Sequence, residues 1–87
     1  MDNDKPITIV YPNPANTTVT VLFNANGNYT MKLADASGNI LQTKTNVAIS
    51  NNRNTIQLDV SKYVAGVYFI TIINEKNESR TVKLKKE

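Results

Sequence analysis

Apolar residues recur at every second position along most of this chain, and this spacing constrains the fold more than any other feature. Such alternation buries one face of an extended strand, whereas the spacing of a buried helix face is nowhere sustained. Turn residues separate the alternating stretches, as in Pro-Asn-Pro at 12–14, Asn26-Gly27 and Ser37-Gly38. The expected strands lie at 7–11, 19–23, 29–33, from 40 onward, 56–60, 67–73 and 82–84.

Short strands at spacings of about 8–12 residues predict an all-β fold, a single antiparallel β-sandwich of immunoglobulin-like size with about seven strands. A closed barrel is the alternative. Residues 7–87 form this domain, and residues 1–6 are expected to be a disordered or expression-derived N-terminal segment. Residues 67–73 are apolar on both faces and therefore predict a central strand. Between 42 and 54 the alternation weakens, and only Val47 and Ile49 are assigned a short extra pairing.

The composition argues against an enzyme. The 87 residues include no Cys and no His, which removes disulfides, thiolate nucleophiles, the commonest metal ligand and the usual general base near neutral pH. Seven Asp and Glu leave carboxylate chemistry, but a domain this small encloses no deep pocket. No segment is long and apolar enough to span a membrane as a helix. We expect a binding, structural or addressing module that uses no cofactor and no metal.

Two candidate carboxylate sites have simpler interpretations. Asp35, Ser37 and Asn39 alternate as in the opening of a calcium loop, but the Gly and Glu required at its sixth and twelfth positions are missing. A hairpin turn explains the segment better, with Asp35 accepting backbone N–H bonds and Gly38 in a left-handed conformation. An enzyme that pairs Asp35 with Asp59 would need a pocket that brings them together, and nothing in the sequence indicates one.

The segment Tyr-Val-Ala-Gly-Val-Tyr at 63–68 has two interpretations. In the structural one, Gly66 relaxes the backbone at a corner and the hydroxyl of Tyr63 or Tyr68 ties the loop to the next strand. In the functional one, Tyr63 stacks on carbohydrate, and the domain is an accessory module that binds carbohydrate or mediates adhesion. We favour the corner and retain the accessory module as the alternative function.

The end of the chain is basic, although the net charge is only +3. Alternating Lys residues are a common way to protect an exposed sheet edge from aggregation. A nucleic-acid contact would also need exposed aromatic side chains for base stacking, and the sequence provides too few. We therefore expect no nucleic-acid partner.

Several of these segments together resemble a known family. They are VYPNPA at 10–15, LADASGNI at 33–40, LDVS at 58–61, AGVYFI at 65–70 and the basic closing segment TVKLKKE at 81–87. In this order and spacing, from residue 7 to 87, the chain resembles the type A C-terminal sorting domain of the type IX secretion system. It departs from the family at Asn39, where a Lys commonly follows the turn glycine, and at 43–53, which carries no strong motif.

The resemblance implies that the domain is a sorting signal and carries no active site. Such domains end exported proteins of the Bacteroidetes group, follow an N-terminal cargo domain in the precursor and fold in the periplasm. The outer-membrane type IX translocon and its shuttle recognise them there. A sortase-like cysteine peptidase then typically removes the domain, and the cargo is anchored to anionic lipopolysaccharide at the cell surface or secreted.

We hypothesise that the last strand and its outer edge form the docking surface. An added strand would supply main-chain bonds, and the charges would steer the partner. The candidate recognition residues are Arg80, Lys83, Lys85, Lys86 and Glu87. The remaining motif residues are assigned to turn geometry and fold maintenance, namely Pro12, Asn13, Pro14, Asp35, Gly38, Gly66 and Tyr68.

Overall fold

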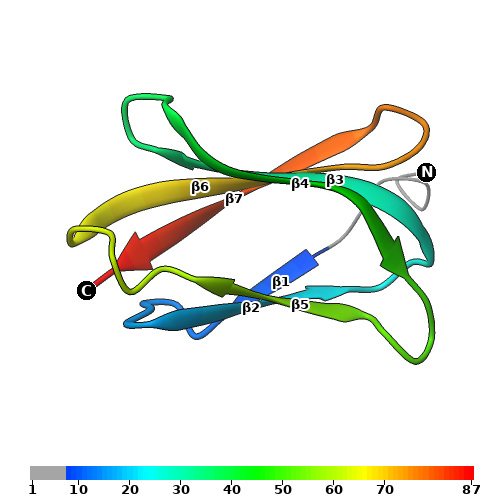
Figure 1. Ribbon diagram of the computed structural model, residues 1–87, viewed down its shortest axis with the longest axis horizontal. Coiled ribbons are helices and arrows are strands. Elements are labelled where there is room, and N and C mark those ends of the chain that lie inside the picture. Colours follow the sequence, from blue (N-terminus) through cyan, green and yellow to red (C-terminus); the bar gives the residue numbers. More distant parts are fainter. Residues whose placement is uncertain (1–7) are drawn as a thin grey trace.

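Two antiparallel sheets pack face to face and bury the alternating apolar positions between them (Figure 1). The computed structural model describes residues 8–87, so the expectation for residues 1–6 falls outside the described part. The strands are β1 (Thr8–Tyr11), β2 (Thr18–Phe23), β3 (Gly27–Asp35), β4 (Ile40–Ile49), β5 (Thr55–Asp59), β6 (Gly66–Ile73) and β7 (Ser79–Lys86). One sheet has the order β1-β2-β5 and the other β4-β3-β6-β7. The predicted all-β sandwich is confirmed.

The core follows the period of two. On β3, Tyr29, Met31 and Leu33 are buried, while Thr30 and Lys32 between them are partly exposed on the other face. The buried apolar residues are Val10, Ala15, Val19, Val21, Phe23, Tyr29, Met31, Leu33, Ile49, Leu58, Val60, Tyr68, Ile70, Ile72 and Leu84. Both sheets contribute to this cluster, and its burial is the main force that holds them together.

The strand β4 is longer than the sequence predicts. It runs unbroken from Ile40 to Ile49 along the edge of the four-stranded sheet, whereas the sequence predicts a strand that begins at Ile40 and, beyond Gln42, only a short pairing at Val47 and Ile49. Its pairing with β3 shifts register twice, which breaks the alternation of side chains. Most side chains of this edge strand are exposed, so the strand needs no apolar alternation and the sequence pattern underestimates it.

The strand β6 lies between β3 and β7, as its apolar character predicts. Tyr68, Ile70 and Ile72 are buried against the other sheet, and the alternate side chains are only partly exposed on the outer face. Residues 61–65 between β5 and β6 form a loop with turns. Within residues 8–87 no helix has the length and apolar character of a membrane span.

Candidate partner-recognition surface

The strand β7 presents Lys83 and Lys85 on the outer face of the four-stranded sheet. It pairs with β6 in one continuous register, which places Lys83 opposite Phe69 and Lys85 opposite Val67. Leu84, between the two lysines, is fully buried. Arg80 and Glu87 are also exposed, so four of the five candidate recognition residues are accessible to a partner.

Lys86 does not belong to this exposed surface. Only 7% of it is exposed, because it shares the inner face of β7 with Leu84 two residues earlier. Its Nζ donates a hydrogen bond to the main-chain oxygen of Glu87 at 3.1 Å. Directly opposite Lys86 on β6 is Gly66, with a φ of 156°. The side chain of Lys86 is therefore packed inside the domain and cannot steer a partner.

The outer edge of β7 is closed over its second half by the Pro-Asn-Pro segment. The Asn13 side chain substitutes for a strand: its Nδ2 donates to the Lys83 carbonyl and its Oδ1 accepts from the Lys85 N–H, both at 3.0 Å. Ala15 continues the edge, donating to the Lys85 carbonyl at 2.8 Å and accepting from the Glu87 N–H at 2.9 Å. The expectation that this edge is open for an added strand is wrong from Lys83 to Glu87.

Both prolines that flank Asn13 follow cis peptide bonds, at Tyr11-Pro12 and Asn13-Pro14. Neither proline has an N–H to donate, so the edge bonds come from the Asn13 amide and the Ala15 backbone. Sequence reasoning placed Asn13 in a turn but did not find this long-range contact, because it joins residues 70 positions apart.

The Asp35 turn is held by its own hydrogen bonds. Oδ1 of Asp35 accepts from the N–H groups of Ser37 and Asn39 at 3.0 and 2.9 Å, and Oδ2 accepts from Asn39 Nδ2 at 3.1 Å. Gly38 has a φ of 92°, the left-handed conformation that favours glycine. The pKa of Asp35 is lowered first by the Asn39 N–H and then by the Asn39 side chain and the Ser37 and Gly38 N–H groups.

Asp59 serves a different turn at the end of β5, in the other sheet. Its Oδ1 accepts from the hydroxyl and the N–H of Ser61 at 2.6 and 2.9 Å. These two bonds, in that order, and the nearby Lys62 charge lower the pKa of Asp59. Each of the two carboxylates is thus engaged in a separate turn. No group of three or more His, Cys, Asp or Glu side chains suited to a metal ion occurs in the described part of the chain.

Tyr63 and Tyr68 form the corner between β5 and β6. Their rings stack with centroids 5.6 Å apart, and the Tyr68 hydroxyl donates to the Val64 carbonyl at 2.6 Å. Gln42 Nε2 donates to the Tyr63 hydroxyl at 2.7 Å and to the Asp59 carbonyl at 3.1 Å, which ties β4 to this corner. Tyr63 is partly buried against the core. This arrangement supports the structural interpretation over an open carbohydrate platform.

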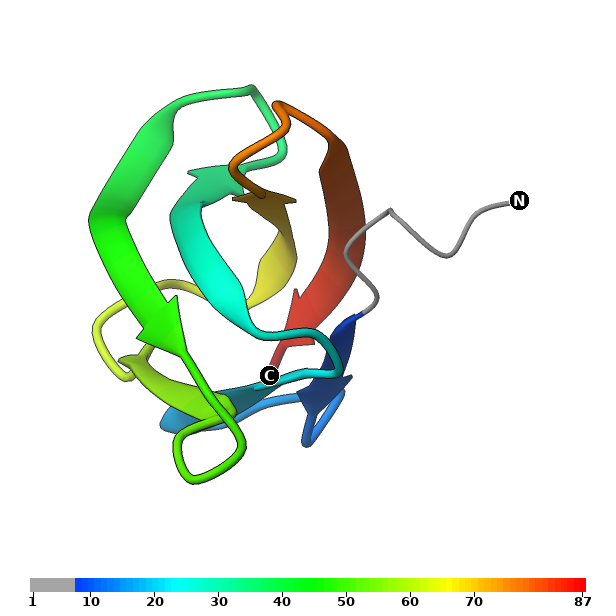
Figure 2. The same ribbon diagram turned by 90° about the vertical axis from the view of Figure 1, so that its right-hand side faces the viewer.

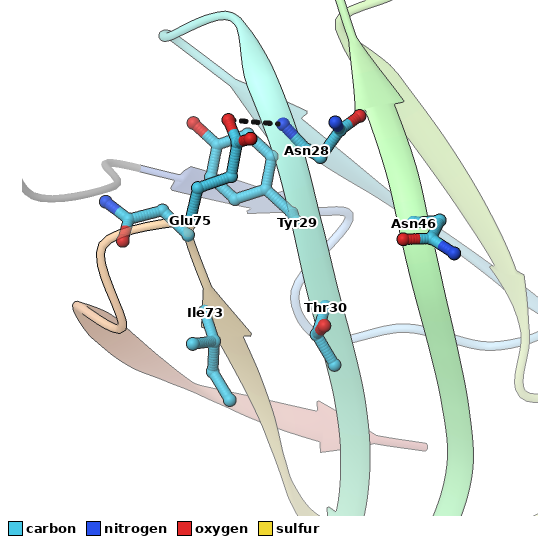
Figure 3. Close-up of a pocket in the computed structure, with 7 residues that line it drawn as sticks. Asn28, Tyr29, Thr30, Asn46, Ile73 and Glu75 are labelled. Atoms are coloured by element: carbon cyan, nitrogen blue, oxygen red, sulfur yellow. Dashed lines mark hydrogen bonds between the residues drawn. The ribbon is translucent and has the colours of Figure 1, made fainter.

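A shallow polar depression of about 220 Å³ lies where β3 and β4 approach the turn after β6 (Figure 3). Glu75 Oε1 accepts from the Asn28 N–H at 3.3 Å. Burial, with Glu75 nearby, raises the pKa of Tyr29. No motif in the sequence indicates this site. Its lining residues are Asn28, Tyr29, Thr30, Asn46, Ile73, Asn74 and Glu75. One carboxylate among amide side chains forms neither a catalytic pair nor a strong cation site.

A family model matches most of the chain. The family described as the secretion system C-terminal sorting domain matches residues 9–87, which includes all or nearly all of each strand in both sheets. The search of curated proteins gives no significant match.

Solved structures are similar to the chain in fold. A DUF3244 protein from Bacteroides vulgatus, described as an immunoglobulin-like β-sandwich, superposes with a TM-score of 0.74 at 17% identity, covering 99% of this chain and 88% of that one. PorZ, a surface component of the type IX secretion system of Porphyromonas gingivalis, gives 0.68 at 18% identity, with 92% of this chain but only 11% of PorZ covered. The Ig1 domain of mouse SynCAM 2 gives 0.57 at 16% identity, covering 97% and 94%. The immunoglobulin-like character of the fold is confirmed.

Proposed function

Since the chain belongs to the family of type IX secretion C-terminal sorting domains, we propose that it directs a cargo protein that precedes it across the outer membrane through that system. The observation that carries the proposal is the family match from residue 9 to 87, which covers the folded domain from β1 to the end of the chain. A role in sorting toward the cell surface or the medium follows from membership itself.

In this proposal the domain is a substrate of the machinery. It folds in the periplasm, the outer-membrane translocon and shuttle recognise it, and a sortase-like cysteine peptidase removes it while the cargo is anchored to lipopolysaccharide or released. The chain's own chemistry is compatible with this passive role. It contains no Cys and no His, and both Asp35 and Asp59 are engaged in turn hydrogen bonds. Sorting domains and immunoglobulin-like sandwiches are non-catalytic families.

We assign the recognition to the exposed charges of β7, which are Arg80, Lys83 and Lys85, and to the terminal Glu87. Exposed lysines on one strand would attract an acidic partner surface and orient it before contact. Deleting residues 81–87 would be an ambiguous test, because it also removes the buried Leu84 from the core. Substitutions of exposed side chains are needed to separate recognition from folding.

The function is tested by fusing the domain to the C-terminus of an exported periplasmic reporter in a type IX-competent host. The expected result is reporter on the cell surface or in the medium, whereas the reporter without the domain stays in the periplasm. Leu84→Asp is the folding control, because a carboxylate at a fully buried position prevents packing and should abolish export. Equal export with and without the domain would refute the proposal.

A further inference from the structure

The outer face of the four-stranded sheet is turned away from the other sheet (Figure 1). The strand registers place a strip of apolar residues on this face. The cross-strand registers place Ile40 of β4, Ala34 of β3, Phe69 of β6 and Lys83 of β7 in one row across the sheet. Val67 lies two residues before Phe69 on the same face and opposite Lys85. We call Ile40, Ala34, Val67 and Phe69 the outer strip.

The outer strip is apolar where a sandwich normally presents polar side chains. Ile40 is 54% exposed, and Phe69 and Val67 are partly exposed. Ala34, directly opposite Phe69, has too small a side chain to cover the ring. An aromatic side chain near the centre of an accessible surface is a common anchor of protein interfaces.

The charged side chains that the strands place beside the outer strip are lysines, and the exposed Glu87 lies beyond the end of β7. Lys83 and Lys85 border it along β7, and Lys32 lies on the same face of β3. The strands β4, β6 and β7 contain no Asp or Glu, and the one carboxylate of β3, Asp35, is bonded within its own turn. A partner that covers this face therefore gains from carboxylates placed opposite the lysines.

We propose that the outer strip and its bordering lysines dock onto a protein surface of the secretion machinery that has an apolar centre and a rim of Asp and Glu. This inference rests on the proposed function and specifies which surface of the domain is read. Docking uses the sheet face, because Asn13 and Ala15 already occupy the β7 edge from Lys83 to Glu87.

Charge and shape select this partner over two others. In a second copy of the chain packed on the same face, Lys83 and Lys85 would meet the same lysines, which like-charge repulsion disfavours. A bilayer would require apolar side chains that protrude, whereas Phe69 and Val67 are partly buried and lie next to the polar Thr71–Thr81 hydroxyl pair at 3.0 Å.

The test compares reporter fusions substituted on this face with a control fusion substituted at other exposed positions. The double variant Lys83→Glu/Lys85→Glu reverses the charge of the rim, and Lys44→Glu/Lys62→Glu makes the same change in net charge at other exposed positions. We expect export to fall about tenfold or more in the first and to stay near wild type in the second. Ile40→Thr, which keeps a β-branched residue at an exposed position, should reduce export several-fold. The thermal midpoint of each purified variant, within a few degrees of wild type, shows that folding is intact.

Several outcomes would overturn the inference. Wild-type export of Lys83→Glu/Lys85→Glu would reject this face while leaving the sorting function in place, whereas failure of the wild-type fusion to be exported would reject the function itself. Loss of export in Thr81→Pro with an unchanged thermal midpoint would indicate strand addition at the free part of the edge. If the 87-residue chain sediments as a dimer and Phe69→Thr sediments as a monomer, the partner that covers this face is a second copy of the chain. Binding to phosphatidylglycerol vesicles that the rim variant loses would identify a membrane.

Discussion

The contact between Asn13 and β7 predicts that the Pro-Asn-Pro segment stabilises the domain through the Asn13 side chain. Asn13→Ala removes the side-chain amide that bonds the Lys83 carbonyl and the Lys85 N–H. Each such bond contributes about 0.5–1.5 kcal/mol net, so the pair contributes roughly 1–3 kcal/mol. Because Asn13 is exposed, we expect the lower half of this range, since water can replace the lost partner.

For a domain of this size each kcal/mol shifts the thermal midpoint by about 4–8 °C, so Asn13→Ala should lower it by roughly 5–15 °C. Urea unfolding provides the free energy directly. Hydrogen exchange adds a local measurement, because the Lys85 N–H loses its acceptor and should exchange faster, while the buried strand β3 stays protected.

Two further variants define the outcome. Asn16→Ala is the matched control, because its exposed side chain makes no hydrogen bond within residues 8–87, and its stability should not change. Asn13→Asp keeps the acceptor for Lys85 but loses the donor to Lys83, so its stability should fall as well. An Asn13→Ala variant with wild-type stability and wild-type exchange at Lys85 would refute the assignment of this residue as the closure of the edge.

Three other predictions concern stability. Gly38→Ala should cost about 1–2 kcal/mol, measured by urea unfolding, because φ is 92° while open space surrounds the added Cβ, so that the cost is conformational. Leu84→Ala should cost about 2–5 kcal/mol by the same assay, since the side chain is fully buried. The lowered pKa of Asp35 means that its charged form contributes stability above its usual value of 3.8, and that this contribution is lost as pH falls further. Below about pH 4 the thermal midpoint of Asp35→Asn should therefore fall less with decreasing pH than that of the wild type. An equal fall in both proteins would contradict this.

The sequence predicts most of the fold because local alternation determines it. The stretches at 19–23, 29–33 and 67–73 alternate or are continuously apolar, and each becomes a strand whose inner face is buried. The strand β4 is underestimated because an edge strand with exposed faces and two register shifts leaves no such pattern. The strand count and the two-sheet architecture survive this error, since they depend on the turns.

The candidate site is less accessible to sequence reasoning because it depends on contacts between distant segments. The basic residues of β7 were visible, but the alternation that turns Lys83 and Lys85 outward also turns Lys86 inward. The closure of the edge by Asn13 joins the two ends of the chain and has no local signal. The outer strip likewise can be identified only when the four strands are placed in register, although the sequence shows that residues 67–73 are apolar on both faces.

The view from the end of the sandwich shows how these features come together (Figure 2). The strand β7 lies beside β1 at one side of the molecule, and the segment after β1 returns to the end of β7. The contacts with this segment hold β7 in place while its outward residues stay exposed.

Recognition of the domain as a sorting signal by the type IX machinery can be measured as the extracellular fraction of one reporter fusion in two strains. One strain has an intact type IX outer-membrane system, and the other is identical except for the loss of that system. The account predicts that the folded fusion is at the surface or in the medium of the first strain and trapped in the periplasm of the second. Equal extracellular fractions in the two strains would contradict it.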